Sequence, residues 1–290
     1  TEPVVKNIKD HLKVYPLAEA DNPRPVQYYN VSNQYINTLH AQDITFFNEV
    51  NEVVQEEPNE AFDPEVLGLL ASIGIEKGKP FAPDARMKKI LSDAAAWGTA
   101  AQRTILFRNR NENVVIWPGS KSWEMGFAGG SYEFLKDGVS LINERTRFHF
   151  YATGITPAMV KPPVGAGSQY VKGLRDSKGR PLDGNKTYRI HIPPKVPARR
   201  FWDITVYDNQ TRSLIQTDNP YPGVTSIDPA TVANADGSYD VYLGPQKPEG
   251  NVNWIQTDPA KGFNLLWRIY GPTQVWYDGG WRPSEIELVN

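Results

Sequence analysis

The chain of 290 residues contains no cysteine. Disulfides, thiolate nucleophiles and cysteine-ligated metals are therefore excluded, while both the cytosol and an oxidising periplasm remain compatible compartments. No run of about 18 apolar residues occurs, so we expect no membrane-spanning helix. The charge is also nearly balanced, because 31 Lys and Arg face 33 Asp and Glu, a net charge of −2. Without a basic excess, we do not expect nucleic acid as a partner.

What the chain does contain is typical of a folded protein with much β structure. Hydrophobic residues make up 40% and charged residues 22% of the sequence, which excludes a disordered chain. The 23 Gly and 24 Pro indicate many turns, and the 8 Trp, 14 Tyr and 11 Phe favour strands. The length favours two domains.

Residues 1–105 are predicted to form a helical region. The apolar residues of DITFFNEVNEVVQEE (43–57) recur at helical spacing. Asp63 followed by Pro64 is typical of a helix start, and Asp84 opens a further amphipathic segment. We expect helices near residues 3–14, 43–57, 63–73 and 84–101.

Residues 106–184 are predicted to be a mixed connecting region. NVVIWP (113–118) favours a short strand, and residues 133–152 favour a helix. The Pro- and Gly-rich stretch 154–184 predicts an irregular connection. Its VGAGSQYVKG run (164–173) lacks the flanking strand and helix of a dinucleotide-binding loop, so we expect a flexible segment there.

Residues 185–290 are predicted to form an antiparallel β-sandwich of the jelly-roll type. Apolar and polar residues alternate in FWDITVYD, SYDVYLG and GFNLLWRIYG, as in half-buried strands. The regular spacing of the candidate strands fits a sandwich. These strands begin near Tyr188, Phe201, Ser213, Tyr239, Val252, Phe263, Gln274 and Glu285. The fold class expected for the whole chain is α+β.

Several motifs resemble bacterial exported proteins of the paired domain-of-unknown-function families 1254 and 1214. In the second half these motifs are LDGNKTYRIHIPP (182–194), ARRFWDITVYD (198–208), NADGSYDVYLG (234–244), GNVNW (250–254), LLWRIYGP (265–272) and DGGWRP (278–283). In the first half they are HLKVYPL (11–17), FFNEV (46–50), LLASIGIEKGKPFAPDARM (69–87) and ATGITPAM (152–159).

This resemblance implies a jelly-roll fold and a periplasmic or secreted location. Proteins of these families usually carry an additional amino-terminal β domain, which has no counterpart here. The resemblance therefore implies a truncated, processed or divergent member, whose partners are that absent domain or further copies of the chain. It implies no reaction.

Candidate catalytic residues come from the strand patterns. His191 alternates with Ile190 and Ile192, while Asp203 and Arg268 leave the apolar faces of their strands. Together with Arg199 they form a hypothetical site, although a role as surface or packing residues explains them more simply. No G-x-S-x-G motif is present, and a Ser-His-Asp triad stays open because its members need not be adjacent in sequence.

No metal or cofactor is expected from the motifs. The four histidines form no HxxxH or HExxH pair, and the Asp-rich turns lack the calcium-loop spacing. Trp254, Tyr270, Trp281 and Arg282 are candidate ligand-binding residues, because aromatic rings stack on organic ligands and Arg clamps anions. The alternative is that these residues fill the core or a subunit interface.

Two functions of different classes follow. The first is a cell-envelope or exported jelly-roll protein that acts through binding of a small-molecule ligand or through oligomerisation. The alternative is a hydrolase-like enzyme for a small organic or sugar-like substrate, with its site on the sandwich.

Overall fold

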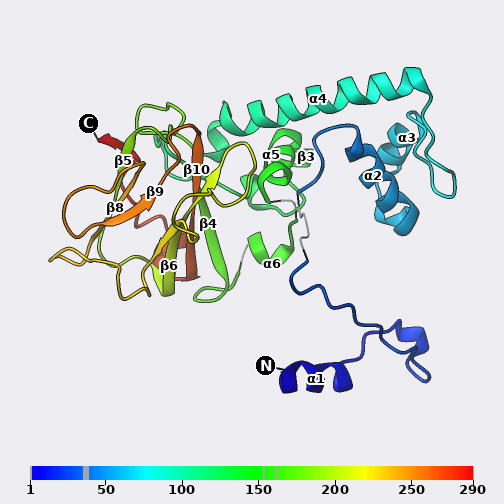
Figure 1. The fold of residues 1–290 in the computed structure, drawn as a ribbon, viewed down its shortest axis with the longest axis horizontal. Helices are drawn as coiled ribbons and strands as arrows, with labels where there is room; N and C mark the ends of the chain where they lie inside the picture. Colours follow the sequence, from blue (N-terminus) through cyan, green and yellow to red (C-terminus); the bar gives the residue numbers. More distant parts are fainter. Residues whose placement is uncertain (1, 35–38, 153, 161, 290) are drawn as a thin grey trace. The chain divides into compact units, whose positions relative to one another are not determined.

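The computed structural model describes residues 2–34, 39–152, 154–160 and 162–289 (Figure 1). The chain divides into two units, residues 1–40 and 41–290. The first unit contains helix α1 (Glu2–His11) and the short 3-10 helix η1 (Leu17–Glu19). The helix expected near residues 3–14 is confirmed. None of its side chains is buried.

In the second unit, three helices confirm the expected helical region. They are α2 (Thr45–Glu56), α3 (Pro64–Ala71) and α4 (Ala85–Phe107), with the 3-10 helix η2 (Asn59–Ala61) between the first two. Asp63 and Asp84 cap α3 and α4, because their carboxylates accept hydrogen bonds from the first-turn amides of Glu65 and Met87. Helix α4 extends beyond the expected end to Phe107. Among the described residues, no helix is both long and apolar enough to span a bilayer.

The region 106–184 differs most from expectation. The predicted strand 113–118 is wrong, since the 3-10 helix η3 (Glu112–Val114) is followed by a single bridge between Val115 and Glu124. The predicted helix 133–152 begins only at Ile142, because Asp137 and Gly138 adopt positive φ angles and turn the chain into a hairpin. The elements observed are β1 (Trp123–Met125), η4 (Ala128–Gly130), β2 (Leu135–Lys136), β3 (Val139–Ser140) and α5 (Ile142–Ala152).

The irregular connection expected over residues 154–184 is also wrong in its centre. Helix α6 (Pro157–Val160) is followed by β4 (Ser168–Gly173), which pairs with β1 on one side and with β10 (Phe263–Pro272) on the other. The sandwich therefore takes two strands from before residue 185.

Strand pairing gives two large sheets and the small two-stranded sheet β2-β3. The five-stranded sheet has the order β1-β4-β10-β6-β7, and the four-stranded sheet has the order β11-β5-β8-β9. All pairs within them are antiparallel except β8 and β9, which are parallel. The remaining strands are β5 (Thr187–Ile192), β6 (Ala198–Asp208), β7 (Gly223–Thr225), β8 (Tyr239–Gly244), β9 (Asn253–Gln256) and β11 (Glu287–Val289).

The sheets share one core, which positions everything on their outer faces. Val171, Ile204 and Trp267 of the five-stranded sheet are fully buried, as are Ile190 and Val241 of the four-stranded sheet, and all belong to one apolar cluster. Alternate residues therefore face outward. The α+β class, with a helical region followed by a sandwich, is confirmed.

Two of the expected strands are not formed as predicted. The segment at Gln274 is a helical turn, α7 (Gln274–Tyr277), which buries Trp276 against Trp117. The segment at Ser213 contributes only a single bridge between Leu214 and Tyr207. Strand β7, in contrast, was not expected.

A buried ion pair ties α5 to the sheet. The Glu124 carboxylate on β1 is 1% exposed and the Arg147 side chain on α5 is fully buried. Arg147 Nη1 donates to Glu124 Oε2 at 2.7 Å, and its Nη2 donates to the Met125 carbonyl oxygen. Arg175 Nη2 donates to the other carboxylate oxygen of Glu124. Both oxygens are therefore held by arginines.

We expect Glu124→Ala to lower the free energy of unfolding by about 3–5 kcal/mol, because it leaves Arg147 buried without its counterion. Urea unfolding followed by tryptophan fluorescence measures the change. Asp93→Asn, which breaks an exposed i,i+4 pair with Lys89 on α4, is the control and should change little. Equal effects of the two variants would contradict this account of α5.

Candidate functional site

A cavity of about 260 Å³ lies on the outer face of the five-stranded sheet. Residues of strands β4, β6 and β10 form the floor of the cavity, and residues of α5, α6 and the end of α4 form its walls. Figure 1 shows α5 and α6 beside these strands. This volume is near the lower end of the range for small-molecule sites. The apolar walls are formed by Leu106, Phe107, Phe127, Phe148, Met159 and Leu266.

The polar side chains of the floor are placed by strand register. Lys172 of β4 is opposite Glu124 on one side and Leu266 on the other. In the next row, Arg268 of β10 is opposite Tyr170 and Asp203. These residues face outward because Val171 and its equivalents on the neighbouring strands face the core.

Arg268 is fixed by three hydrogen bonds. Its Nη1 donates to Asp203 Oδ1 at 2.8 Å and to Thr205 Oγ1 at 2.9 Å, and its Nη2 donates to the Tyr207 hydroxyl. Burial opposes the positive charge, but Tyr207 and Asp203 outweigh it and hold the pKa of the guanidinium above its ordinary value. Of the five N–H donors of an arginine, these bonds use three. The guanidinium is thus a rigid cation with further donors.

Lys172 is buried in a different environment. Lys172 is only 6% exposed, and its Nζ lies 3.9 Å from the centroid of the Tyr151 ring. No hydrogen bond or ion pair to another described residue reaches this amine. Burial, reinforced by the positive charge of Arg147, lowers the pKa of Lys172 to about 7 even though Glu124 acts in the opposite direction.

Two further polar groups line the cavity. Burial raises the pKa of the Tyr151 phenol, with a smaller opposing effect of Arg147, so this group stays neutral at physiological pH. Asn264 Nδ2 donates to Asn209 Oδ1 at 2.7 Å. The Asn264 side-chain oxygen is buried and has no partner within the described part of the chain. It offers an acceptor to a ligand donor.

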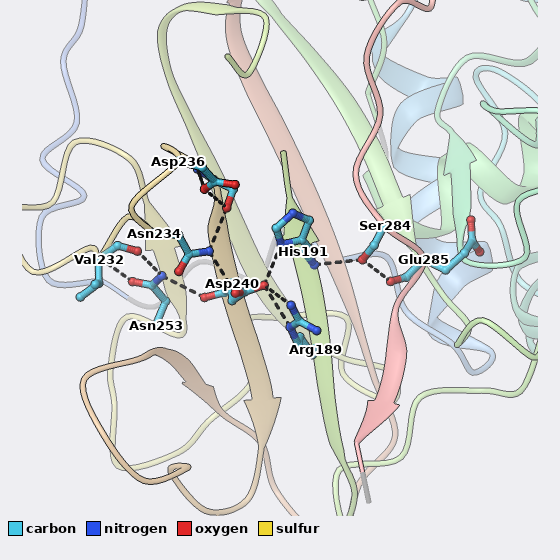
Figure 2. Close-up of polar contacts among 10 residues, drawn as sticks. Arg189, His191, Val232, Asn234, Asp236, Asp240, Asn253, Ser284 and Glu285 are labelled. Carbon is cyan, nitrogen blue, oxygen red and sulfur yellow. Dashed lines mark hydrogen bonds and ion pairs between the residues drawn. The ribbon is translucent and has the colours of Figure 1, made fainter. Parts of the chain in front are cut away.

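A second polar cluster lies on the outer face of the four-stranded sheet (Figure 2). His191 Nδ1 lies 2.9 Å from Asp240 Oδ1, and Arg189 and Asn234 also donate to this carboxylate. Burial alone would raise the pKa of Asp240, but the hydrogen bonds from His191, Asn234 and Arg189 lower it below its ordinary value. Asp240 is therefore the anionic centre of the cluster.

Ser284 does not complete a triad with His191 and Asp240. Figure 2 shows Ser284 meeting the backbone of His191, and its Oγ accepts from the His191 backbone amide at 2.9 Å. The Ser284 hydroxyl donates to the Glu285 carbonyl oxygen at 2.7 Å. A nucleophilic serine donates to the imidazole instead.

The four residues of the hypothetical catalytic site are not brought together. Asp203 and Arg268 form an ion pair on the cavity face. His191 faces outward from the other sheet, with the shared core between them. Arg199 is exposed at the start of β6, beside the glycine turns at Gly165 and Gly271. One site composed of all four is geometrically excluded.

The four predicted ligand-binding residues lie outside the cavity lining. Tyr270 stacks on Phe201, with ring centroids 4.0 Å apart. The indole N–H groups of Trp254 and Trp281 donate to the carbonyl oxygens of Gly244 and Pro194. Trp281 also packs edge-on against Trp267 of the core. Arg282 lines a separate surface depression beside Lys121 and Glu285. A ligand-binding role for these residues stays a prediction.

Sequence reasoning missed Lys172 and Tyr151. Lys172 falls in the stretch that was expected to be a flexible connection, and Tyr151 falls in the segment 133–152, which was expected to be a helix without any functional residue. The alternation of Tyr170, Val171 and Lys172 is the pattern that predicts β4, and it places Tyr170 and Lys172 on one face. No local pattern predicts that α5 covers that face. Among the described residues, no group of three or more His, Asp or Glu is arranged to hold a metal ion.

We expect Lys172→Met to change how stability depends on pH. The pKa of Lys172 is about 7 in the folded protein and returns to about 10.4 in the unfolded chain. Between these values the unfolded state binds more protons, so wild-type stability rises with pH across that window. Below about pH 7 both states are protonated, and the cost of the buried charge, of the order of 4 kcal/mol, is fully present.

The measurement is urea unfolding of wild type and Lys172→Met between about pH 6 and about pH 10.5. The stability advantage of the variant should be largest at the acidic end and should shrink as pH rises. Lys121→Met, at an exposed lysine, is the control and should follow the wild-type profile. An advantage of Lys172→Met that is constant with pH would contradict a neutral buried amine.

Comparisons with known proteins establish only coarse similarity. A search of curated proteins finds no match. The VPA0106 protein from Vibrio parahaemolyticus is a solved structure with 19% identity and a TM-score of 0.43 over 100% of this chain and 65% of its own. A putative uncharacterized protein from Burkholderia cenocepacia has 15% identity and a TM-score of 0.38, over 74% of this chain and 46% of its own.

The chain thus spans less than two-thirds of the length of either protein, and similarity at these TM-scores carries no argument about function. A family model adds a firmer finding for part of the chain. Residues 167–274, which include the cavity-floor strands β4, β6 and β10, match the family described as "Protein of unknown function (DUF1214)".

Proposed function

We propose that the protein binds a small organic molecule, with an apolar body and an anionic group, in the cavity between α5 and the five-stranded sheet. The observation that carries this proposal is the composition of the cavity lining. Apolar side chains form most of its walls, and three basic side chains, Lys172, Arg212 and Arg268, also line it. Sites of this kind take ligands whose apolar part is buried and whose polar part is fixed by a few groups.

The charge of the lining favours an anion over a cation. No Asp or Glu of the described residues lines the cavity. Asp203 pairs with the positive charge of Arg268. The guanidinium still has N–H donors that are not used in its bonds to Asp203, Thr205 and Tyr207. A carboxylate is the group that best matches the planar donor fork of an arginine.

Binding is favoured over hydrolysis on the sandwich surface. Hydrolysis at the predicted residues would need His191 near Asp203 and Arg268, whereas the core separates them. Ser284 is oriented toward backbone groups and not toward the His191 ring. Among the described residues, the His191 ring contacts Asp240 and receives no hydrogen bond from a hydroxyl.

We further propose that the protein works in the periplasm or outside the cell, and that its partner is a second copy or an amino-terminal β domain of the family-1254 type. The resemblance to exported proteins supports the first point, and the cysteine-free composition is compatible with it. The resemblance of residues 11–87 and 152–159 to the longer paired proteins supports the second.

Isothermal titration calorimetry tests the binding proposal. We expect benzoate or hexanoate to bind at least about tenfold more tightly than benzyl alcohol or hexanol, a difference of about 1.4 kcal/mol. Leu266→Trp should abolish this binding, because the larger ring fills the space above β10. Tyr242→Trp adds a similar ring at an outward position of β8 on the other sheet and is the matched control, which should bind normally.

Two results would overturn the proposal. One is the absence of binding by carboxylates and alcohols alike at millimolar concentration. The other is equal binding by Leu266→Trp and Tyr242→Trp, which would place the ligand elsewhere.

A further inference from the structure

We propose that Lys172 forms an imine with the carbonyl group of its ligand, so that the cavity takes an aldehyde or ketone that also carries an anionic group. This inference rests on the proposed binding function and names the ligand class more closely. The proposal is based on what surrounds the Lys172 amine, because a buried lysine with a purely structural role normally has a carboxylate partner.

The first observation is that Lys172 has no counterion although a carboxylate lies directly across the strand. Glu124 is its neighbour in register on β1. Arg147 and Arg175 take the two oxygens of that carboxylate. Lys172 therefore lines the cavity without an ion pair to any described residue. Structural lysines at this depth are normally paired.

The second observation is the shape of the space around the amine. Nζ lies above the Tyr151 ring, and the apolar side chain of Leu266 is the neighbour in register on the other side. These side chains pack beside the amine, which itself lines the cavity. Apolar neighbours disfavour water and so protect an imine from hydrolysis.

The third observation is the spacing between Lys172 and Arg268. Lys172 is opposite Leu266, and Arg268 is two residues further along β10 on the same face. Two residues along a strand correspond to about 6.6 Å and adjacent strands lie about 4.8 Å apart, so the backbones of these diagonal neighbours are separated by roughly 8 Å. A rigid ligand with a carbonyl at one end and a carboxylate at the other can therefore engage both side chains.

The reactivity of the amine agrees with this geometry. With a pKa of about 7, close to half of the Lys172 amines are neutral at neutral pH, compared with roughly one in two thousand for an ordinary lysine. Only the neutral amine is a nucleophile. Arg268 and Arg147 also disfavour the protonated form.

The reaction balances without a further reactant. The Nζ lone pair attacks the carbonyl carbon, one amine proton passes to the carbonyl oxygen, and a neutral carbinolamine forms. The C–O bond then breaks as the C=N bond forms, and the hydroxyl leaves as water with the second amine proton. The step is reversible and involves no change in oxidation state.

The test uses 4-formylbenzoate as the probe and cyanoborohydride to reduce any imine to a stable amine. Intact-mass spectrometry counts the adducts on the purified chain, and peptide mapping locates them. We expect one main adduct, on Lys172, formed at least about tenfold faster than at any other lysine. Its rate should rise between about pH 6 and about pH 8 as the amine loses its proton.

Two variants keep the test specific. Lys172→Met should lose the main adduct, and Lys172→Arg should also lose it while keeping a cation at this position. Lys121→Met, at an exposed lysine, should react like the wild type. Circular dichroism of each variant confirms that the fold is retained.

The outcomes separate this inference from the function on which it rests. Calorimetric binding of benzoate without a preferred adduct on Lys172 overturns the imine and leaves the binding proposal standing. Modification of Lys172 that excess benzoate does not slow contradicts recognition of the anion in this cavity. Modification spread evenly over the surface lysines overturns the imine as well.

Discussion

The buried Glu124 carboxylate is the group on which the site depends. It lies on the short edge strand β1, and its two oxygens bind Arg147 from α5 and Arg175 from the segment after β4. Buried ions of this kind are stable only when each is paired and hydrogen-bonded. The requirement ties α5 to the edge of the sheet, because Arg147 of this helix binds both the Glu124 carboxylate and the Met125 carbonyl oxygen of β1. The outer face of β4 and β10 is thereby covered along one side, and a cavity remains beside the helix.

The same ion pair determines the chemistry of the cavity. Because Glu124 is occupied by two arginines, the lysine opposite it in register is left without a counterion. Burial and the nearby positive charges then favour the neutral amine. Arg268 contrasts with it, since Asp203 and Tyr207 stabilise its charge. Two basic residues on one face thus have opposite roles, a neutral amine and a fixed cation, and the difference comes from their neighbours.

Local patterns predict much of this fold. The caps at Asp63 and Asp84 and the apolar spacing of residues 43–57 place α2, α3 and α4, and strict alternation places β5, β6, β8 and β10 with the correct faces. Alternation also places Asp203 and Arg268 on the outward faces of their strands, and the pairing of β6 with β10 then brings the two together. Strand β4 was missed because Gly165, Gly167 and Gly173 lie beside it or at its end, so turn-forming composition obscured the alternation.

The candidate site itself could not be predicted from the sequence. It requires α5 to cover β4, and that contact depends on Glu124 and Arg147, which are 23 residues apart and belong to different elements. For His191, the local structure was predicted but the partner was not. Its strand and face were predicted correctly, but its partner Asp240 lies on the same sheet and Asp203 on the other, which only the pairing order of the strands determines. Alternation gives the face of a residue, and topology decides which faces meet.

Direct titration of the Lys172 amine tests the central claim most closely. Nuclear magnetic resonance of protein labelled with ¹⁵N at the lysine side chains, assigned with Lys172→Met, follows Nζ as pH is raised. The account predicts a midpoint near 7 for Lys172, well below the range of the exposed lysines. A midpoint near 10.4, the value of a solvated lysine, would show that the amine is charged and would contradict the account.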